Sequence, residues 1–250
     1  MRHQRVLVLF FILTLTTRCF IGSESTKFII QNRCPDTIWP ATLAGSGTPQ
    51  LASTGFQLSP GSTTSLDLPT GWSGRLWART LCSTDSLGKF NCDTGDCGSG
   101  TITCNGAGGA PPASLIEFTL SGHNGNDQDF YDISLVDGFN LPISVTPQGG
   151  SGTKCNTISC PVNLNSGCPG ELALVGAGGR AIGCKSACFA LGQPQYCCTG
   201  GYGSPSTCPP TVYSKYFKGA CPQAYSYAYD DGSSTFTCSG QPDYLITFCP

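Results

Sequence analysis

The sequence predicts an all-β protein held together by disulfides, and two observations support this prediction. Short runs of β-branched and aromatic residues alternate with turn residues along the chain, which has 33 glycines, 18 prolines and little helical periodicity. The chain also has 17 cysteines, of which Cys19 follows an apolar N-terminal run and the other sixteen extend from Cys34 to Cys249. An even set of this kind is typical of disulfides formed in an oxidising compartment.

The N-terminus predicts a secretory signal peptide over residues 1–26, cleaved between residues 22 and 26. Basic residues precede the apolar run 6–15, and small residues follow it, which is the order of such signals. A membrane anchor is the weaker alternative, because a bilayer span needs about 20 apolar residues. No later segment is apolar enough to span a membrane.

The charge balance argues against nucleic acid as a partner. Without the three arginines of the signal peptide, ten Lys and Arg face fourteen or fifteen Asp and Glu, so the mature chain carries about −4 to −5. Phosphate backbones select basic surfaces instead. Only 11% of all residues are charged, below the usual quarter, so a charged residue inside an apolar segment is informative.

Strands are expected where the β-branched and aromatic runs occur, separated by turns such as Pro60-Gly61. The expected strands are residues 28–32, 63–68, 75–80, 115–120, 130–135, 143–146, 235–238 and 244–248. Two short helices are expected as well. One covers residues 184–188 with Gly192 at its end, and the other covers residues 211–218 with Gly219 as its stop.

The cysteine spacing does not favour a metal site. Zinc sites use closely spaced cysteine pairs, often with histidines. Here Cys197 and Cys198 are adjacent, and His123 is the single histidine of the mature chain. We therefore expect no metal and no cofactor.

Residues 88–104 carry a motif that points to a family. The segment GKFNCDTGDCGSG at residues 88–100, followed by Cys104, resembles the signature of the thaumatin-like proteins, the fifth class of plant pathogenesis-related proteins. The resemblance covers the mature chain and includes WART at 77–80, FYDISLVDGFN at 130–140 and TFCP at 247–250. The sixteen cysteines follow the order of that family.

The resemblance implies a β-sandwich of eleven strands, a helical disulfide-rich lobe, a small stapled lobe and an acidic cleft. The sandwich would comprise residues 27–79, 113–161 and 222–250. The small lobe would comprise residues 80–112, and the larger lobe residues 162–221. The resemblance further implies eight disulfides: Cys34–Cys249, Cys82–Cys92, Cys97–Cys104, Cys155–Cys238, Cys160–Cys221, Cys168–Cys184, Cys188–Cys197 and Cys198–Cys208.

Several charged residues interrupt apolar, strand-like segments. Glu117 lies within 115–118, Asp132 and Asp137 bracket residues 133–136, and Arg79 follows Trp77. A carboxylate in such a setting needs a partner, a hydrogen bond or a cleft. From the residues alone, a solvated face or a structural ion pair is the more common explanation.

The resemblance favours a cleft instead. Family members that act on fungal glucans share one arginine, one glutamate and three aspartates, which match Arg79, Glu117, Asp132, Asp137 and Asp230. Asp231 is an alternative to Asp230. Phe139 is expected to line the cleft.

Glycoside hydrolysis requires two carboxyl groups with different protonation states. We expect Glu117 to act as the acid and Asp137 as its ionised partner, with Arg79 keeping one carboxylate ionised. Asp132 and Asp230 would contact sugar hydroxyls. Because residues five apart on a regular strand face opposite sides, Asp132 and Asp137 can share a cleft only if the strand ends or bends between them.

Three functions therefore stay open. The protein is a weak secreted endo-β-1,3-glucanase, a glucan-binding defence protein without turnover, or an antifungal protein directed at a membrane or a receptor. The chain stops at Cys249-Pro250, without the extension of vacuolar family members, so we expect an extracellular monomer whose partner is β-1,3-glucan.

Overall fold

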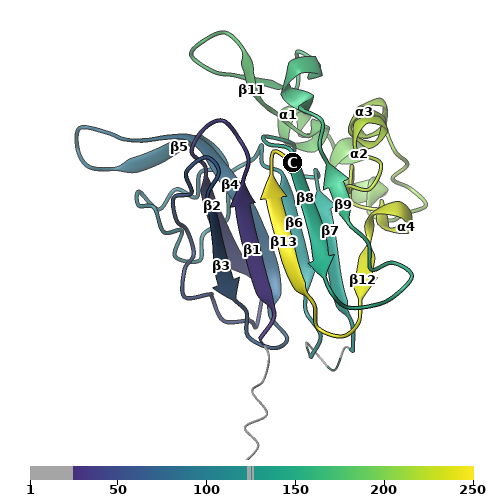
Figure 1. The fold of residues 1–250 in the computed structure, drawn as a ribbon. Helices are drawn as coiled ribbons and strands as arrows, with labels where there is room; N and C mark the ends of the chain where they lie inside the picture. The colour runs from purple at the N-terminus through teal and green to yellow at the C-terminus, as the bar shows by residue number, and fades with distance from the viewer. Residues whose placement is uncertain (1–24, 123–124, 126) are drawn as a thin grey trace, which may run out of the picture.

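The computed structural model describes residues 25–122, 125 and 127–250. The predicted signal peptide lies almost entirely outside this part and stays a prediction. Two β-sheets face each other, and short helices lie beside them at one end (Figure 1). The expectation of an all-β core with few helices is confirmed.

The first sheet joins both ends of the chain. Its strands, in spatial order, are β3 (Thr63–Asp67), β1 (Lys27–Asn32), β13 (Asp243–Phe248), β8 (Ile143–Gln148) and β9 (Ile158–Cys160). β1 and β13 pair in parallel, and the other pairs are antiparallel. The first and last strands of the protein are therefore direct neighbours.

The second sheet is antiparallel and carries the residues of the candidate site. Its strands, in spatial order, are β12 (Phe236–Cys238), β7 (Asp129–Ser134), β6 (Leu115–Thr119), β4 (Ser73–Thr84) and β2 (Trp39–Ala44). A sixth strand, β5 (Phe90–Thr94), pairs with the far half of β4, and the two form a hairpin that projects from the sandwich (Figure 1).

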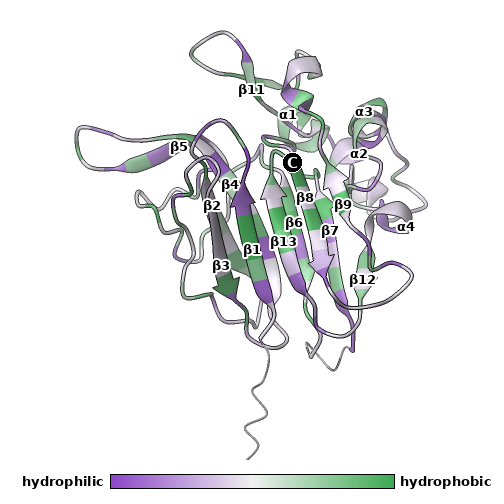
Figure 2. Ribbon diagram, viewed as in Figure 1, coloured by the Kyte–Doolittle hydropathy of each residue, from purple (hydrophilic) through white to green (hydrophobic). Residues whose placement is uncertain are grey.

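The two sheets share one hydrophobic core. Alternate residues of each strand point inward, as the period of two requires. Phe118 of the second sheet lies between Phe28 and Tyr244 of the first, with ring centroids 4.4 Å and 4.8 Å away. Figure 2 shows hydrophobic residues along β1 and β8, which contribute to this core. The opposite face of the second sheet points away from this core and is available for a functional site.

The helical lobe follows β9 and consists of short elements. In chain order they are η2 (Leu164–Gly167), β10 (Ala173–Val175), β11 (Ala181–Cys184), α1 (Ala187–Leu191), α2 (Pro194–Cys197), η3 (Gly200–Tyr202) and α3 (Val212–Ala220). A further helix, α4 (Asp231–Ser234), precedes β12. Among the described residues, no helix is both long and apolar enough to cross a membrane.

Both helix predictions need correction. Cys184 ends strand β11 and exchanges two backbone hydrogen bonds of 2.7 Å with Phe139, so the helix begins only after its cap Ser186. Gly192 does end it, in the left-handed conformation (φ 63°) that favours glycine. The second helix starts after Thr211 as expected but runs through Gly219 to Ala220.

The strand prediction was incomplete. All eight expected strands are present. Their ends differ little from expectation except in β4, which extends over Ser73–Thr84 instead of 75–80. Five more strands were missed: β2, β5, β9, β10 and β11. β9, β10 and β11 have three or four residues each, too few for a sequence pattern. β2 contains a proline, which sequence rules assign to edge strands or turns, and β2 is indeed an edge strand.

The disulfide prediction is confirmed in full. The structure contains the eight expected pairs: Cys34–Cys249, Cys82–Cys92, Cys97–Cys104, Cys155–Cys238, Cys160–Cys221, Cys168–Cys184, Cys188–Cys197 and Cys198–Cys208. Five of them close loops with sequence separations of 7 to 16 residues. One of the five, Cys82–Cys92, joins residues that are paired across the β4–β5 hairpin. Cys34–Cys249 joins the chain ends beyond β1 and β13.

Candidate functional site

Three charged residues lie side by side on the outer face of the second sheet. Arg75 of β4 is paired in register with Glu117 of β6, and Glu117 is paired with Asp132 of β7. Cross-strand partners have Cβ atoms about 5 Å apart, so the three side chains form one row. Their sequence neighbours Ile116 and Ile133 are fully buried in the core, which places the row on the opposite face.

This row lies in a groove. One section, about 450 Å³ in volume, extends over β2, β4, β6 and β7 and is lined by Arg75, Glu117, Asp132 and Phe130. A second section contains the same three charged residues and adds Asp137. A third section continues from Asp137 along α1 and α2 of the helical lobe. The sections share residues, so they form one continuous acidic groove that runs from the outer face of the sandwich to the helical lobe.

Asp137 reaches the groove because β7 ends before it. The strand stops at Ser134, and a turn follows in which the Gly138 N–H donates to the Leu135 carbonyl at 2.9 Å. Gly138 adopts φ 94° and lies against the Cys184 carbonyl, where a Cβ atom would be only 2.5 Å away, so glycine is required here. The alternation of the strand therefore does not apply to Asp137, and this residue lines the groove together with Glu117 and Asp132.

The groove shifts the protonation of two carboxyl groups. Burial raises the pKa of Glu117; the positive charge of Arg75 opposes this, and the negative charge of Asp137 adds to it. Burial raises the pKa of Asp132 well above its ordinary value, and Glu117 and Asp231 add to the shift. One carboxyl oxygen of Asp132, Oδ1, is buried and has no hydrogen-bond partner among the described residues. Such an unsatisfied group is costly to a fold and marks a candidate site.

We predict that Asp132→Asn stabilises the protein. With a raised pKa, Asp132 ionises in the unfolded chain at lower pH than in the native state. Wild-type stability therefore falls as pH rises from the ordinary aspartate pKa to the raised one. The amide removes this loss, so the gain should be absent below pH 3 and reach about 1 kcal/mol at neutral pH. Denaturant unfolding at several pH values measures it.

Asp129 on the same strand is the matched control for Asp132. It is fully buried, but its carboxylate accepts hydrogen bonds from the Ser121 N–H at 2.7 Å and the Tyr244 hydroxyl at 2.8 Å. Asp129→Asn should therefore destabilise the protein, because an amide cannot accept both bonds. If both variants lose stability, Asp132 is a structural residue and not a strained member of the groove.

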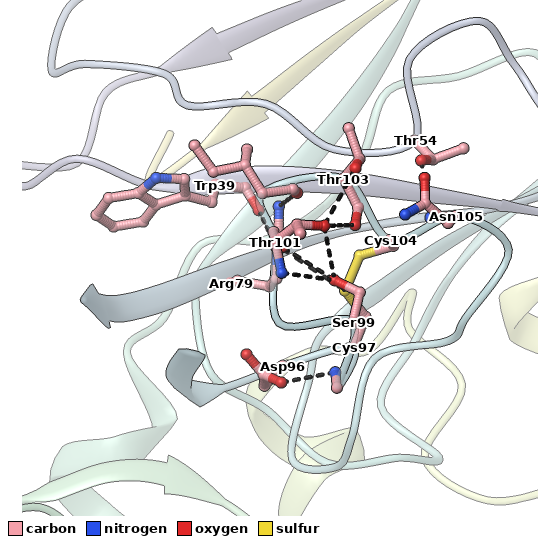
Figure 3. Close-up of a disulfide and its surroundings, with 12 residues drawn as sticks. Trp39, Thr54, Arg79, Asp96, Cys97, Ser99, Thr101, Thr103, Cys104 and Asn105 are labelled. Carbon is pink, nitrogen blue, oxygen red and sulfur yellow. Dashed lines mark hydrogen bonds between the residues drawn. A yellow bond between two sulfur atoms is a disulfide. The ribbon is translucent and has the colours of Figure 1, made fainter. Parts of the chain in front are cut away.

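Arg79 lies elsewhere, contrary to expectation. It is fully buried beneath the small lobe, where Nε donates to the Trp39 carbonyl at 3.1 Å and Nη2 to the Ile102 carbonyl at 2.6 Å. The guanidinium lies beside the Cys97–Cys104 disulfide, with Nη1 3.7 Å from the sulfur of Cys97 (Figure 3). The arginine that lines the groove is Arg75.

Phe139 does not line the groove either. Its side chain is fully buried in the core, and its backbone pairs with Cys184. The aromatic side chain that sequence reasoning missed is Phe130, which is 38% exposed and lies two residues before Asp132 on the same face of β7. An alternation argument applied from Asp132 could have found it.

Asp230 makes structural contacts beside the groove and does not line it. It forms a 2.9 Å ion pair with Lys218 of α3 and accepts bonds from the backbone and hydroxyl of Ser226 at 3.0 Å and 2.8 Å. Asp231 is more exposed, accepts a 2.9 Å bond from the groove-lining Tyr225 and contributes to the pKa shift of Asp132. Of the two, Asp231 is the residue whose charge acts on Asp132, while both add to the rise that burial causes in the pKa of Tyr227 in the third groove section.

The fold, the disulfides and the groove define a disulfide-stapled β-sandwich with an acidic cleft against a helical lobe. The sequence profile of the Thaumatin family matches residues 32–250. The chain belongs to this family.

Two relatives are similar to the chain in sequence, and one solved structure is similar to it in fold. It is 65% identical over 229 residues to "Thaumatin-like protein 1" of Pyrus pyrifolia, covering 92% of this chain and 93% of that protein. It is 54% identical over 247 residues to a Prunus avium protein named "Glucan endo-1,3-beta-glucosidase", covering 99% and 100%. A family 64 β-1,3-glucanase from Paenibacillus barengoltzii, solved with laminarihexaose, shares the fold at 14% identity, with a TM-score of 0.56 over 90% of this chain and 74% of that one.

Proposed function

We propose that this protein is a secreted plant defence protein whose acidic groove binds β-1,3-glucans of fungal walls and hydrolyses them slowly. The observation that carries the proposal is the row Arg75, Glu117 and Asp132 across three adjacent strands, joined by Asp137 at the end of β7. The eight disulfides suit an extracellular setting. The Prunus avium relative named as a glucan endo-1,3-beta-glucosidase supports the substrate class.

The two carboxyl groups needed for hydrolysis would be Glu117 and Asp137. Glu117, whose pKa is raised by burial, would donate its proton to the glycosidic oxygen as the bond from that oxygen to the anomeric carbon breaks. Water supplies the oxygen that bonds to the anomeric carbon, and its proton returns to the carboxyl pair. Asp137 would act as the base for that water, or as a nucleophile whose bond to the anomeric carbon the water then breaks.

The other groove residues would hold the sugar. Asp132 keeps its proton to higher pH than an ordinary aspartate, so it can donate a hydrogen bond to a sugar oxygen. Phe130 presents a partly exposed ring in the same groove section, and flat apolar rings suit the faces of sugars.

Two measurements on the wild-type protein test the proposal. Release of reducing ends from a soluble β-1,3-glucan tests turnover, and co-sedimentation with an insoluble β-1,3-glucan tests binding. Binding without release would leave a glucan-binding defence protein and refute hydrolysis. Absence of both would refute the proposal. Leakage of protein-free lipid vesicles, measured in parallel, would support the membrane-directed alternative instead.

We predict that Arg75→Gln moves the alkaline limb of the rate–pH profile upward. The positive charge of Arg75 lowers the pKa of Glu117 against the effect of burial, so its loss raises that pKa further. Glu117 then keeps its proton to higher pH, and kcat/KM falls later as pH rises. Arg33→Gln, a change at an exposed arginine away from the groove, is the control and should leave the profile unchanged. A limb that moves downward would contradict the acid role of Glu117.

A further inference from the structure

A second hollow lies apart from the acidic groove. It has a volume of about 610 Å³, and none of its lining residues is shared with the three groove sections. Its walls include Trp39 of β2, Leu81 of β4 and Ile182 of β11. It therefore lies where the β4–β5 and β10–β11 hairpins leave the sandwich, and both hairpins project at the same end of the molecule (Figure 1). We call it the hairpin hollow.

The apolar part of the hairpin hollow includes an aromatic ring with a free polar edge. Trp39 is half-buried, and its ring packs against Phe90 at 6.0 Å between centroids. The indole N–H of Trp39 has no hydrogen bond to another described residue and is not enclosed. In Figure 3 the ring of Trp39 points away from Arg79 and the disulfide. Leu81, 52% exposed, and Ile182 extend this apolar wall.

The polar part of the hairpin hollow consists mainly of uncharged hydrogen-bond donors and acceptors. Asn165 donates from Nδ2 to the Asn140 carbonyl at 3.0 Å, but its Oδ1 is buried without a partner among the described residues. Asn163 and Thr37 also line the hollow, and Asp36 is the one charged residue among the described residues of its lining. No described lysine or arginine contributes to the lining, so phosphate, sulfate and acidic sugars are disfavoured.

Two lining residues hold an unusual backbone conformation. Leu81 has φ 52° and Cys249 has φ 56°, in the left-handed region that residues other than glycine rarely adopt. For Leu81 no tight turn requires it, since the residue lies inside β4. Strained backbone of this kind concentrates at binding sites, and here it accompanies an exposed leucine and an unpaired amide oxygen.

We propose that the hairpin hollow binds a neutral saccharide and is a second carbohydrate site of this protein. A sugar ring has one apolar face and a rim of hydroxyl groups. The apolar face matches Trp39 and Leu81, and the hydroxyls match the polar groups of Asn163, Thr37 and Asp36. The volume of about 610 Å³ falls in the range of small-molecule sites. The proposal does not require turnover in the acidic groove.

Tryptophan fluorescence can report on this site alone. The chain has three tryptophans, and Trp72 and Trp77 are fully buried, so a soluble quencher such as acrylamide reaches chiefly Trp39. Laminaritriose should protect Trp39 from quenching in a saturable manner. The protection should be the same in Phe130→Ala, a change that weakens sugar binding in the groove, because Phe130 lines the groove and not the hairpin hollow. Absence of protection, or its loss in Phe130→Ala, would overturn the proposal.

A pair of leucine variants completes the test. Leu81→Gly removes part of the apolar wall and suits the positive φ, so it should fold normally and weaken protection by about fivefold or more. Leu87→Gly alters an exposed leucine at the tip of the same hairpin and should have no effect. Equal effects of both variants, or protection by cyclohexanol but not by laminaritriose, would refute a saccharide site. Reducing-end release is measured separately, so failure of the groove hypothesis is distinguishable.

Discussion

Glu117→Gln should lower the rate of β-1,3-glucan hydrolysis by about 100-fold or more while leaving glucan binding nearly unchanged. The amide has the size and shape of the carboxyl group, but its N–H protons are not acidic. It therefore cannot transfer a proton to the leaving oxygen. Binding should persist because Phe130, Asp132 and Asp137 still line the groove. Initial rates of reducing-end release and co-sedimentation with insoluble glucan measure the two effects.

Glu171→Gln is the matched control, because it makes the same chemical change at an exposed site of the helical lobe. Glu171 accepts a hydrogen bond from Tyr213 and lines none of the three groove sections. Its rate should equal that of the wild type. A Glu117→Gln protein with full activity would show that Glu117 is not the acid. Asp137→Asn should likewise lose turnover and keep binding, which separates the carboxyl pair from residues that only hold the sugar.

The charge environment gives this prediction its physical basis. A general acid must be protonated at the working pH, and burial together with Asp137 moves Glu117 in that direction. Asp132 moves the same way and more strongly. The groove therefore raises the pKa of two of its carboxyl groups, Glu117 and Asp132, chiefly by burial. The exchange of Glu117 for Gln removes the transferable proton without changing the number of groups that face the sugar.

Much of this site could be predicted from the sequence because it depends on local order. Glu117 and Asp132 interrupt apolar strands, and strand alternation places both on the side away from the core. The glycine after Asp137 marks the turn that brings this residue into the groove. The disulfide pairs followed from the family resemblance, since cysteine spacing alone allows too many pairings.

The choice between Arg75 and Arg79 could not be made in this way. The two residues are four apart on β4, so both side chains leave the sheet on the same face. What covers that face differs along the strand. Trp77 packs with Cys97 and Cys104 in a second small core, and Arg79 lies beneath the same lobe, whereas Arg75 remains in the groove. The covering segment is distant in sequence, so no local pattern distinguishes the two arginines.

Arg79→Met should destabilise the protein by about 3 kcal/mol, equivalent to a fall in Tm of about 6–12 °C. The change leaves the carbonyls of Trp39 and Ile102 without their donors and removes the guanidinium that lies 5.3 Å from the Phe90 ring centroid. Burial lowers the pKa of Arg79 to about 10, with Asp96 opposing the shift, so the group stays charged at neutral pH and its hydrogen bonds are charge-assisted. Thermal unfolding followed by circular dichroism measures the loss.

Arg75→Met, four residues away on the same strand, distinguishes a structural arginine from one that serves the groove. Arg75 lines the groove and makes no ion pair within 4 Å with any described residue, so its loss should change stability little but disturb hydrolysis. Arg79→Met should show the opposite pattern, with full activity per folded molecule below its lowered Tm. Arg79→Lys should recover only part of the stability, because one ammonium cannot replace a planar group that reaches Trp39, Ile102 and Cys97 together. If Arg79→Met kept its stability and lost glucan binding, the assignment of the two arginines would have to be reversed.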